Sequence, residues 1–330
     1  MPTLHAFIHA PHERHTVPAP RADNPRRAIL LMCAAGLTFG ISSVLLKFCT
    51  ATVNPFECAF FRTGVGFFIL LIMTAMGLRP RTFGNRISLL ALRGILGAVG
   101  ALSYIWAISR LELGLANALN QTSPIFVCIF AAIFLRERFH WWIYAIVVFA
   151  FFGIALIVNP DFGGINPSAL IALGSGIFSA LAYTCVRVLQ KTDSSETIVM
   201  WLLGVSTLAA AGSALFVPWT LPDATTFAFL MGAGLTAFIA QLLMTSAYRY
   251  APATIVAPFI YLSTFSSIII AFIIWSELPT FWALVGCAIT ILCTILIGVL
   301  PHQQTSTNSD KDQTTHTSTT PREGNVSSND

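Results

Sequence analysis

Long apolar runs separated by short polar turns fill the chain between residues 28 and 300. The hydrocarbon core of a bilayer is about 30 Å thick, so a helix needs roughly 20 apolar residues to cross it. A window of that length finds ten segments, with Pro, Gly or charged residues at nearly every turn between them. The predicted spans are 28–48, 56–77, 87–109, 115–135, 141–159, 167–189, 197–217, 225–247, 253–275 and 281–300. The pattern therefore predicts an all-α polytopic membrane protein with ten transmembrane helices.

The two halves of this pattern resemble each other. A shift of about 140 residues pairs Gly36 with Gly176, Lys47 with Arg187, Glu137 with Glu277 and Trp142 with Trp282. Because each half has an odd number of spans, the halves must have opposite orientations in the membrane, an arrangement that recurs in secondary transporters. We therefore expect two inverted five-helix repeats, at residues 28–160 and 167–300.

The two ends of the chain lack the apolar pattern. Residues 1–27 contain four His together with Pro and Arg, and no apolar stretch like that of a cleavable signal peptide. Residues 301–330 are mostly polar or charged and bury too little apolar surface to offset chain entropy. We expect a cytoplasmic N-terminal tail and a disordered cytoplasmic C-terminal tail.

Composition and charge agree with a membrane location. Hydrophobic residues make up 55% of the chain and charged residues 10%, whereas an ordinary soluble domain is roughly 25% charged. With both termini in the cytoplasm, 14 of the 18 Lys and Arg residues lie inside, and Lys47 and Arg110 lie outside. We therefore expect a multi-pass protein of the inner membrane, surrounded by the lipid bilayer. The basic residues lie between apolar segments, so we interpret them as topology signals and expect no nucleic-acid partner.

Sequence signatures of catalysis are missing. The chain has no phosphate-binding G-x-x-x-x-G-K-[ST] loop, no H-E-x-x-H and no G-x-S-x-G. The seven Cys residues form no C-x-x-C pair, and six of the seven His residues lie in the tails. We therefore expect neither an enzyme nor an ATP-driven pump, and no metal or cofactor.

Ionisable residues within the spans are candidates for function, because charge inside a membrane is costly. They are Glu57, Arg62 and Arg93. Glu57 follows Asn54 and Pro55, so it is interpreted either as part of a helix N-terminal cap or as a carboxylate that attracts a cationic substrate at the outer mouth. Arg62 forms either a local ion pair with Glu57 or a substrate contact. Glu137 and Glu277, at matching ends of the fourth and ninth spans, are expected to anchor loops.

Neutral polar and aromatic residues within the spans complete the candidate site. Amides can hydrogen-bond a substrate or a neighbouring helix, and tyrosine rings can stack on a substrate or pack in the core; both alternatives stay open. The candidate substrate-binding residues are Glu57, Arg62, Arg93, Tyr104, Asn120, Gln121, Tyr183, Gln241 and Tyr261. Pro124 in the fourth span and Pro258 in the ninth would each free a backbone carbonyl; they either mark helix breaks near such a site or are prolines of the kind that membrane helices tolerate for other reasons.

Three motifs carry a family resemblance: Pro55-Phe56-Glu57-Cys58-Ala59-Phe60-Phe61-Arg62, Leu92-Arg93-Gly94 and Ala257-Pro258-Phe259-Ile260-Tyr261-Leu262. With the duplicated five-span pattern, the chain over about residues 28 to 300 resembles the EamA branch of the drug/metabolite transporter superfamily. Within that branch it is similar to S-adenosylmethionine uptake carriers of obligate intracellular bacteria. The resemblance implies a central cavity between the halves, lined by spans one, three, four, six, eight and nine, and rocking exchange without ATP.

The resemblance also implies a function. We expect a secondary transporter of a small organic molecule, taking up S-adenosylmethionine, with S-adenosylhomocysteine as the suggested exchange partner. Adenine would stack on Tyr104 or Tyr261, the sulfonium would meet Glu57 or an aromatic face, and the carboxylate would meet Arg62 or Arg93. The alternative is an exporter of amino acids or other metabolites on the same fold. Either the uptake carrier or the exporter is compatible with a homo-oligomer of this chain.

Overall fold

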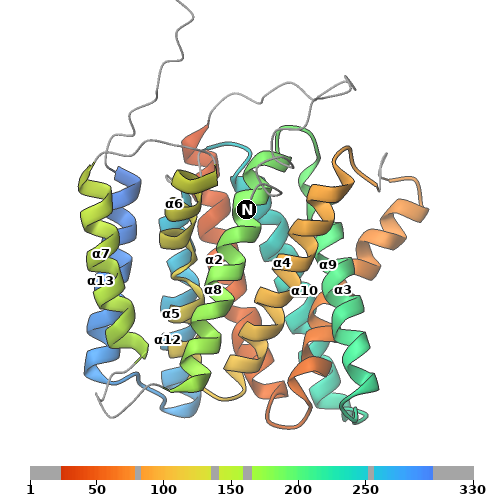
Figure 1. The fold of residues 1–330 in the computed structure, drawn as a ribbon. Coiled ribbons are helices and arrows are strands. Elements are labelled where there is room, and N and C mark those ends of the chain that lie inside the picture. Colours follow the sequence, from red (N-terminus) through yellow and green to blue (C-terminus); the bar gives the residue numbers. More distant parts are fainter. Residues whose placement is uncertain (1–23, 79–82, 135–140, 159–165, 252–255, 300–330) are drawn as a thin grey trace, which may run out of the picture.

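Helices make up all the regular structure in the described part of the chain. The computed structural model describes residues 24–78, 83–134, 141–158, 166–251 and 256–299. The elements, labelled in Figure 1, are α2 (Pro25–Cys49), α3 (Pro55–Ala75), α4 (Ile87–Ile108), α5 (Leu113–Asn120), α6 (Ser123–Phe134), α7 (Trp141–Val158), α8 (Pro167–Leu189), α9 (Ser195–Gly212), η1 (Ser213–Leu215), α10 (Ala224–Ala247), η2 (Ala257–Tyr261), α12 (Leu262–Trp275) and α13 (Phe281–Val299). The expected C-terminal tail, most of the N-terminal tail and Glu137 lie outside the described residues.

The prediction of ten spans is confirmed. Eight segments of the described chain are long and apolar enough to cross a membrane, and two shorter apolar helices, Phe259–Trp275 and Phe281–Leu296, complete the set. All stand roughly side by side in Figure 1. The protein is therefore an all-α polytopic membrane protein.

Helix starts follow directly from the local sequence. Three helices begin with Asn followed by Pro, namely α2 at Asn24, α3 at Asn54 and α8 at Asn166. In each case the Asn side chain accepts a hydrogen bond from a backbone amide of the first turn. Proline is tolerated at the first helical position because a backbone N–H there would have no acceptor within the helix. Asp223 caps α10, and hydrogen bonds from Thr226 hold the pKa of the Asp223 carboxyl below its ordinary value.

The fourth and ninth spans are interrupted near their prolines, which is one of the two alternatives for these residues. Pro124 is the second residue of α6, and α5 ends at Asn120, so the predicted single helix over 115–135 is two helices. Proline removes a backbone donor and clashes with the preceding turn. In the ninth span, Pro258 lies in the 3₁₀ helix η2, and the α-helix α12 begins only at Leu262. Both interruptions leave backbone that is not α-helical within a span, which is tolerated next to protein or a cavity.

The two repeats pack reciprocally and in opposite directions. Helix α2 packs against α10 and α12, while its counterpart α8 packs against α4, α5 and α6. The amide of Asn24, at the start of α2, donates to Tyr250 O. Gln190, at the end of α8, donates to Thr245 O, so both residues lie at the end of α10. Counterpart helices α2 and α8 are therefore antiparallel, and the fold is an inverted repeat.

Two paired glycines bring these helices close to the interrupted spans. A Cβ added at Gly36 of α2 would lie 3.2 Å from Phe259 O in η2. A Cβ added at Gly176 of α8 would lie 2.9 Å from Leu119 O, beside the end of α5. Small residues permit such close backbone approach between membrane helices. Each of the two glycines thus allows the first helix of its repeat to approach the interrupted span of the other repeat closely.

Candidate functional site

A cavity lies between the two repeats. It contains about 850 Å³ of empty space, open solvent at its mouth included. The cavity is lined from the first repeat by α2, α3, α4 and α5 and from the second by α8, α9, α10, η2 and α12. All the spans that the resemblance implied contribute, and α3 and α9 contribute as well.

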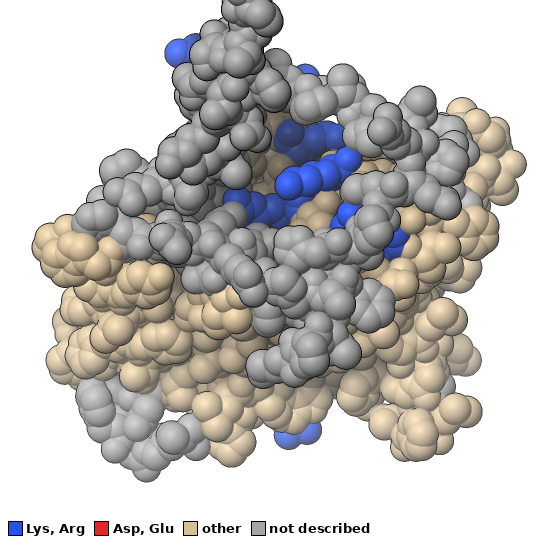
Figure 2. Space-filling view, turned by 45° about the horizontal axis from the view of Figure 1, so that its top comes forward, with Lys and Arg blue, Asp and Glu red and all other residues tan. Residues whose placement is uncertain are grey.

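A hollow opens at the end of the molecule where α2 begins and α8 and α10 end. Figure 2 turns this end, the top of Figure 1, toward the reader, and shows Lys and Arg side chains in and around the hollow. No Asp or Glu is visible there among the coloured residues. The basic residues at these helix ends include Arg26, Arg27, Arg187, Lys191 and Arg249. The charged residues that can be seen in this view at the mouth are therefore basic.

Two arginines of the first repeat line the cavity, as the sequence led us to expect. Arg93 of α4 is 1% exposed, and its Cζ lies 6.0 Å from the ring centroid of Tyr183 on α8. Arg62 of α3 has its Cζ 5.8 Å from the ring centroid of Tyr104 on α4. The Nε atoms of both arginines are buried without a hydrogen-bond partner. In the described residues no Asp or Glu lines the cavity, so the guanidiniums have no carboxylate partner there.

Tyr104 joins a small polar network on the cavity wall. Its hydroxyl donates to Asn117 Oδ1 and lies 2.8 Å from Ser43 Oγ. Asn117 Nδ2 is buried and has no partner. Sequence reasoning did not select Asn117, although it lies one helical turn before Asn120 and therefore on the same face of α5. One donor of this network, Asn117 Nδ2, therefore has no protein acceptor.

The amides of the interrupted fourth span line the cavity and also bond between helices. Asn120 Nδ2 donates to Ser175 Oγ at 2.8 Å. Gln121 Nε2 donates to Ser263 Oγ at 2.7 Å and to Ile260 O at 3.3 Å, which connects the interruption of the fourth span to that of the ninth. Both residues therefore make the helix contacts that were one of the two alternatives, from positions on the cavity wall.

Gln241 completes the candidates that reach the cavity. Its Nε2 is buried without a partner, as is the hydroxyl of Ser206 on α9, which sequence reasoning did not select. Ser and Thr are common in membrane helices as bonding partners of the backbone, so nothing in the sequence marks Ser206.

Glu57 and Tyr261 lie outside the cavity lining. Glu57 is 2% exposed and its Oε2 accepts a hydrogen bond from the amide of Thr220, in the segment before α10. It makes no ion pair with Arg62 in the described structure. The hydroxyl of Tyr261 shares a 3.1 Å hydrogen bond with Thr294 of α13. The structure therefore separates these two candidates from the other seven.

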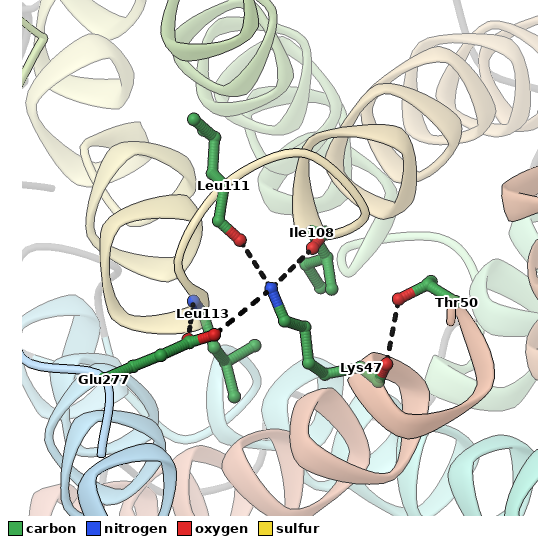
Figure 3. Close-up of polar contacts among 6 residues, drawn as sticks. All are labelled: Lys47, Thr50, Ile108, Leu111, Leu113 and Glu277. Carbon is green, nitrogen blue, oxygen red and sulfur yellow. Dashed lines mark hydrogen bonds and ion pairs between the residues drawn. The ribbon is translucent and has the colours of Figure 1, made fainter. Parts of the chain in front are cut away.

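The opposite end of the molecule is closed around Lys47, shown in Figure 3. Lys47 Nζ donates to Leu111 O at 2.7 Å and to Ile108 O at 3.2 Å, and lies 3.7 Å from Glu277 Oε1. Glu277 Oε2 accepts from the amide of Leu113 at 3.2 Å. One lysine thus connects α2, the end of α4 and the segment after α12. The prediction that Glu277 anchors a loop agrees with these contacts.

Removing the Lys47 ammonium is expected to loosen this closed end. Lys47→Met leaves two carbonyls and a carboxylate without their donor, at a cost of about 1–3 kcal/mol. This cost shifts the equilibrium between the closed and the opened state toward opening by about 5-fold or more. Cys49, fully buried next to Lys47, reports the change. In a variant whose other cysteines are replaced, we expect Lys47→Met to raise the maleimide labelling rate of Cys49 at least 5-fold.

Arg110→Met is the matched control, because Arg110 is an exposed cation at the same end that contacts Trp106. It should leave the labelling rate of Cys49 unchanged. Equal rates for Lys47→Met and the parent would show that Lys47 does not hold this end closed.

The inverted helices and the central cavity form an arrangement that recurs in secondary transporters. The model of the EamA-like transporter family matches residues 26–159 and 166–299. The chain belongs to that family.

Three relatives show the range of cargo on this fold. A pseudopaline exporter of Pseudomonas aeruginosa is 30% identical, over 83% of this chain and 97% of the relative. A riboflavin transporter of Rhizobium johnstonii is 28% identical, over 84% and 93%. An S-adenosylmethionine uptake transporter of Rickettsia prowazekii is 25% identical, over 79% and 88%. The protein is thus a multi-pass metabolite transporter with a small-molecule substrate.

A solved crystal structure shows the same fold. It superposes with a TM-score of 0.60 and 17% sequence identity, and covers 85% of this chain and 99% of the other. Nearly the whole of that second chain therefore matches the ten-span arrangement.

Proposed function

We propose that this protein carries a small, carboxylate-bearing metabolite across the inner membrane by alternating access, without ATP. The observation that carries the proposal is the pair of guanidiniums, Arg62 and Arg93, in a cavity between inverted repeats with no carboxylate partner among the described lining residues. Unpaired charge at membrane depth is costly and marks substrate pathways. A carboxylate of the cargo supplies the missing partner.

The open and closed ends support the alternating mechanism. The hollow opens at the end where α2 begins, and Lys47 closes the other end. Inverted repeats can exchange their conformations, so that the open end closes and the closed end opens. We place both termini in the cytoplasm, which makes the hollow face inward. We take 28–160 and 167–300 as the two exchanging repeats.

S-adenosylmethionine uptake stays a prediction for the particular cargo. The Rickettsia relative supports it, and so do Tyr104 and Tyr183, whose rings lie at the cavity wall where adenine can stack. Glu57, expected to meet the sulfonium, lies outside the lining. The alternative, an exporter of another metabolite, is supported by the Pseudomonas relative. The positive charge of the cavity favours the alternative over a cationic cargo.

Counterflow into proteoliposomes tests the proposal. Full-length protein is reconstituted, the lumen is loaded with one unlabelled compound at a time, and entry of the same labelled compound is followed. The panel contains amino acids, dicarboxylates, S-adenosylmethionine, S-adenosylhomocysteine and riboflavin, which has no carboxylate. We expect saturable exchange of at least one carboxylate-bearing compound and none of riboflavin. Exchange of riboflavin alone, or of nothing above empty liposomes, would contradict the proposal.

A further inference from the structure

We infer that the cavity holds two anionic groups of one cargo at the same time, one at Arg62 and one at Arg93, so that the transported species is an organic dianion or polyanion. This inference rests on the proposed function and narrows its substrate class. The two arginines come from different helices, α3 and α4, and both line the one cavity.

The unsatisfied groups of the cavity wall are mostly donors. Buried lining atoms without a partner are Arg62 Nε, Arg93 Nε, Asn117 Nδ2, Gln241 Nε2 and Ser206 Oγ. The first four can only donate, and the hydroxyl can also donate. Buried polar groups are nearly always hydrogen-bonded in native structures. The group that satisfies this wall must therefore be rich in acceptors.

Three acceptors on the same wall are occupied by protein donors. Asn117 Oδ1 accepts from Tyr104. Ser263 Oγ accepts from Gln121 Nε2, and Thr63 Oγ1 accepts from Thr207. The fully buried lining atoms that lack a partner are thus mainly donors, which favours a cargo that presents acceptors. Carboxylate oxygens, which only accept, match the remaining donors.

The two guanidiniums lie beside tyrosine rings of the cavity wall. Arg62 Cζ lies 5.8 Å from the ring centroid of Tyr104, and Arg93 Cζ lies 6.0 Å from that of Tyr183. Gly97, one turn after Arg93 on α4, leaves room for the guanidinium, because a Cβ there would collide with Arg93 Nη1. Arginine binds carboxylates through two parallel hydrogen bonds in a planar fork. Two such forks in one cavity can pair with two anionic groups of one cargo.

Charge balance leads to the same result. A zwitterion or monoanion neutralises one guanidinium and leaves the other unpaired in a membrane interior, where an unpaired charge costs several kcal/mol. A dianion neutralises both. The basic mouth in Figure 2 raises the local concentration of anions and steers them inward. S-adenosylmethionine, with a sulfonium and an ammonium against one carboxylate, would add positive charge to the site.

Ligand-induced thermal stabilisation of the purified full-length protein tests the inference. The probes are glutarate and adipate, their monomethyl esters as monoanions of matched shape, and chloride, all at one ionic strength. We expect the dicarboxylates to raise the unfolding temperature at concentrations at least 10-fold lower than their monoesters. The wild-type protein alone is sufficient for this test. If the diacid raises the unfolding temperature no more than its monoester does, or no more than chloride does, the inference is overturned.

Arginine variants locate the effect. Arg62→Gln and Arg93→Gln should each abolish the 10-fold preference for the diacid over its monoester. Arg110→Gln, which removes an exposed cation at the closed end, should preserve it. Preserved preference in both cavity variants would overturn the inference. Counterflow separates the two proposals: exchange of monocarboxylates without dicarboxylates refutes the dianion alone, whereas no exchange of any carboxylate refutes the proposed function and the dianion together.

Discussion

Arg93→Ala is expected to impair transport severely, with at least a ~30-fold loss of initial rate at low cargo concentration. Arg93 is 1% exposed on the cavity wall and has no carboxylate partner among the described lining residues. Leaving one partner of a buried charged contact unpaired costs about 2–5 kcal/mol, which corresponds to roughly 30-fold to several thousand-fold in binding. The measurement is counterflow of the carboxylate that the wild-type protein exchanges fastest.

Two controls make the Arg93 result specific. Arg93→Lys keeps the charge but loses the planar fork, so we expect an intermediate rate. Arg110→Ala removes a cation from the exposed surface of the closed end and should transport normally. Protein amount and elution in gel filtration must match the wild type. Wild-type transport by Arg93→Ala would remove Arg93 from the cargo site.

Gly176→Val is expected to prevent correct assembly of the bundle. A Cβ at this position would lie 2.9 Å from Leu119 O and 3.0 Å from Asn120 O. These are backbone atoms at the end of α5, which cannot rotate away as a side chain can. Overpacking in a tight core typically costs 1–3 kcal/mol, and valine adds two further methyl groups to the clash. We expect loss of the monodisperse gel-filtration peak, or an unfolding temperature lowered by about 5 °C or more.

Gly174 provides the matched control on the same helix. A Cβ added there meets nothing within 4 Å. Gly174→Val should therefore give a wild-type elution profile and unfolding temperature. If Gly176→Val and Gly174→Val behave alike, Gly176 is not required for the close approach of α8 to the fourth span.

Hydropathy was sufficient to predict the spans, because a bilayer imposes one helix length on every crossing. Helices α3, α4 and α8 begin and end within two residues of their predicted limits. The interruption at Pro124 was predictable as well, since proline cannot continue a helix. The inverted arrangement followed from an odd number of spans per repeat, and the antiparallel pair α2 and α8 confirms it.

The charged part of the site was predictable, and most of the neutral part was not. Arg62 and Arg93 stand out from an apolar background where charge is rare. Ser206 has no such contrast. Helices that are apolar on all sides also give no periodic signal of which face lines a cavity. Contributions from α3 and α9 therefore became visible only in the structure.

Glu57 and Tyr261 illustrate the same limit of sequence reasoning. Their residue types and their positions within the spans suit a cargo site. The orientation of their side chains, however, depends on contacts with residues that are distant in sequence. Glu57 bonds to the amide of Thr220, and Tyr261 bonds to Thr294. Each partner belongs to a part of the chain that no local pattern connects to the candidate.

Counterflow through a protein locked at its closed end tests alternating access most directly. Lys47→Cys with Glu277→Cys, in a background without other cysteines, places one thiol at each of the two positions whose longer side chains now bring Nζ and Oε1 to 3.7 Å. A short cleavable bis-maleimide joins them across the closed end. We predict that crosslinking stops exchange of the carboxylate cargo and that cleaving the linker restores it. Continued exchange through fully crosslinked protein would contradict alternating access at this cavity.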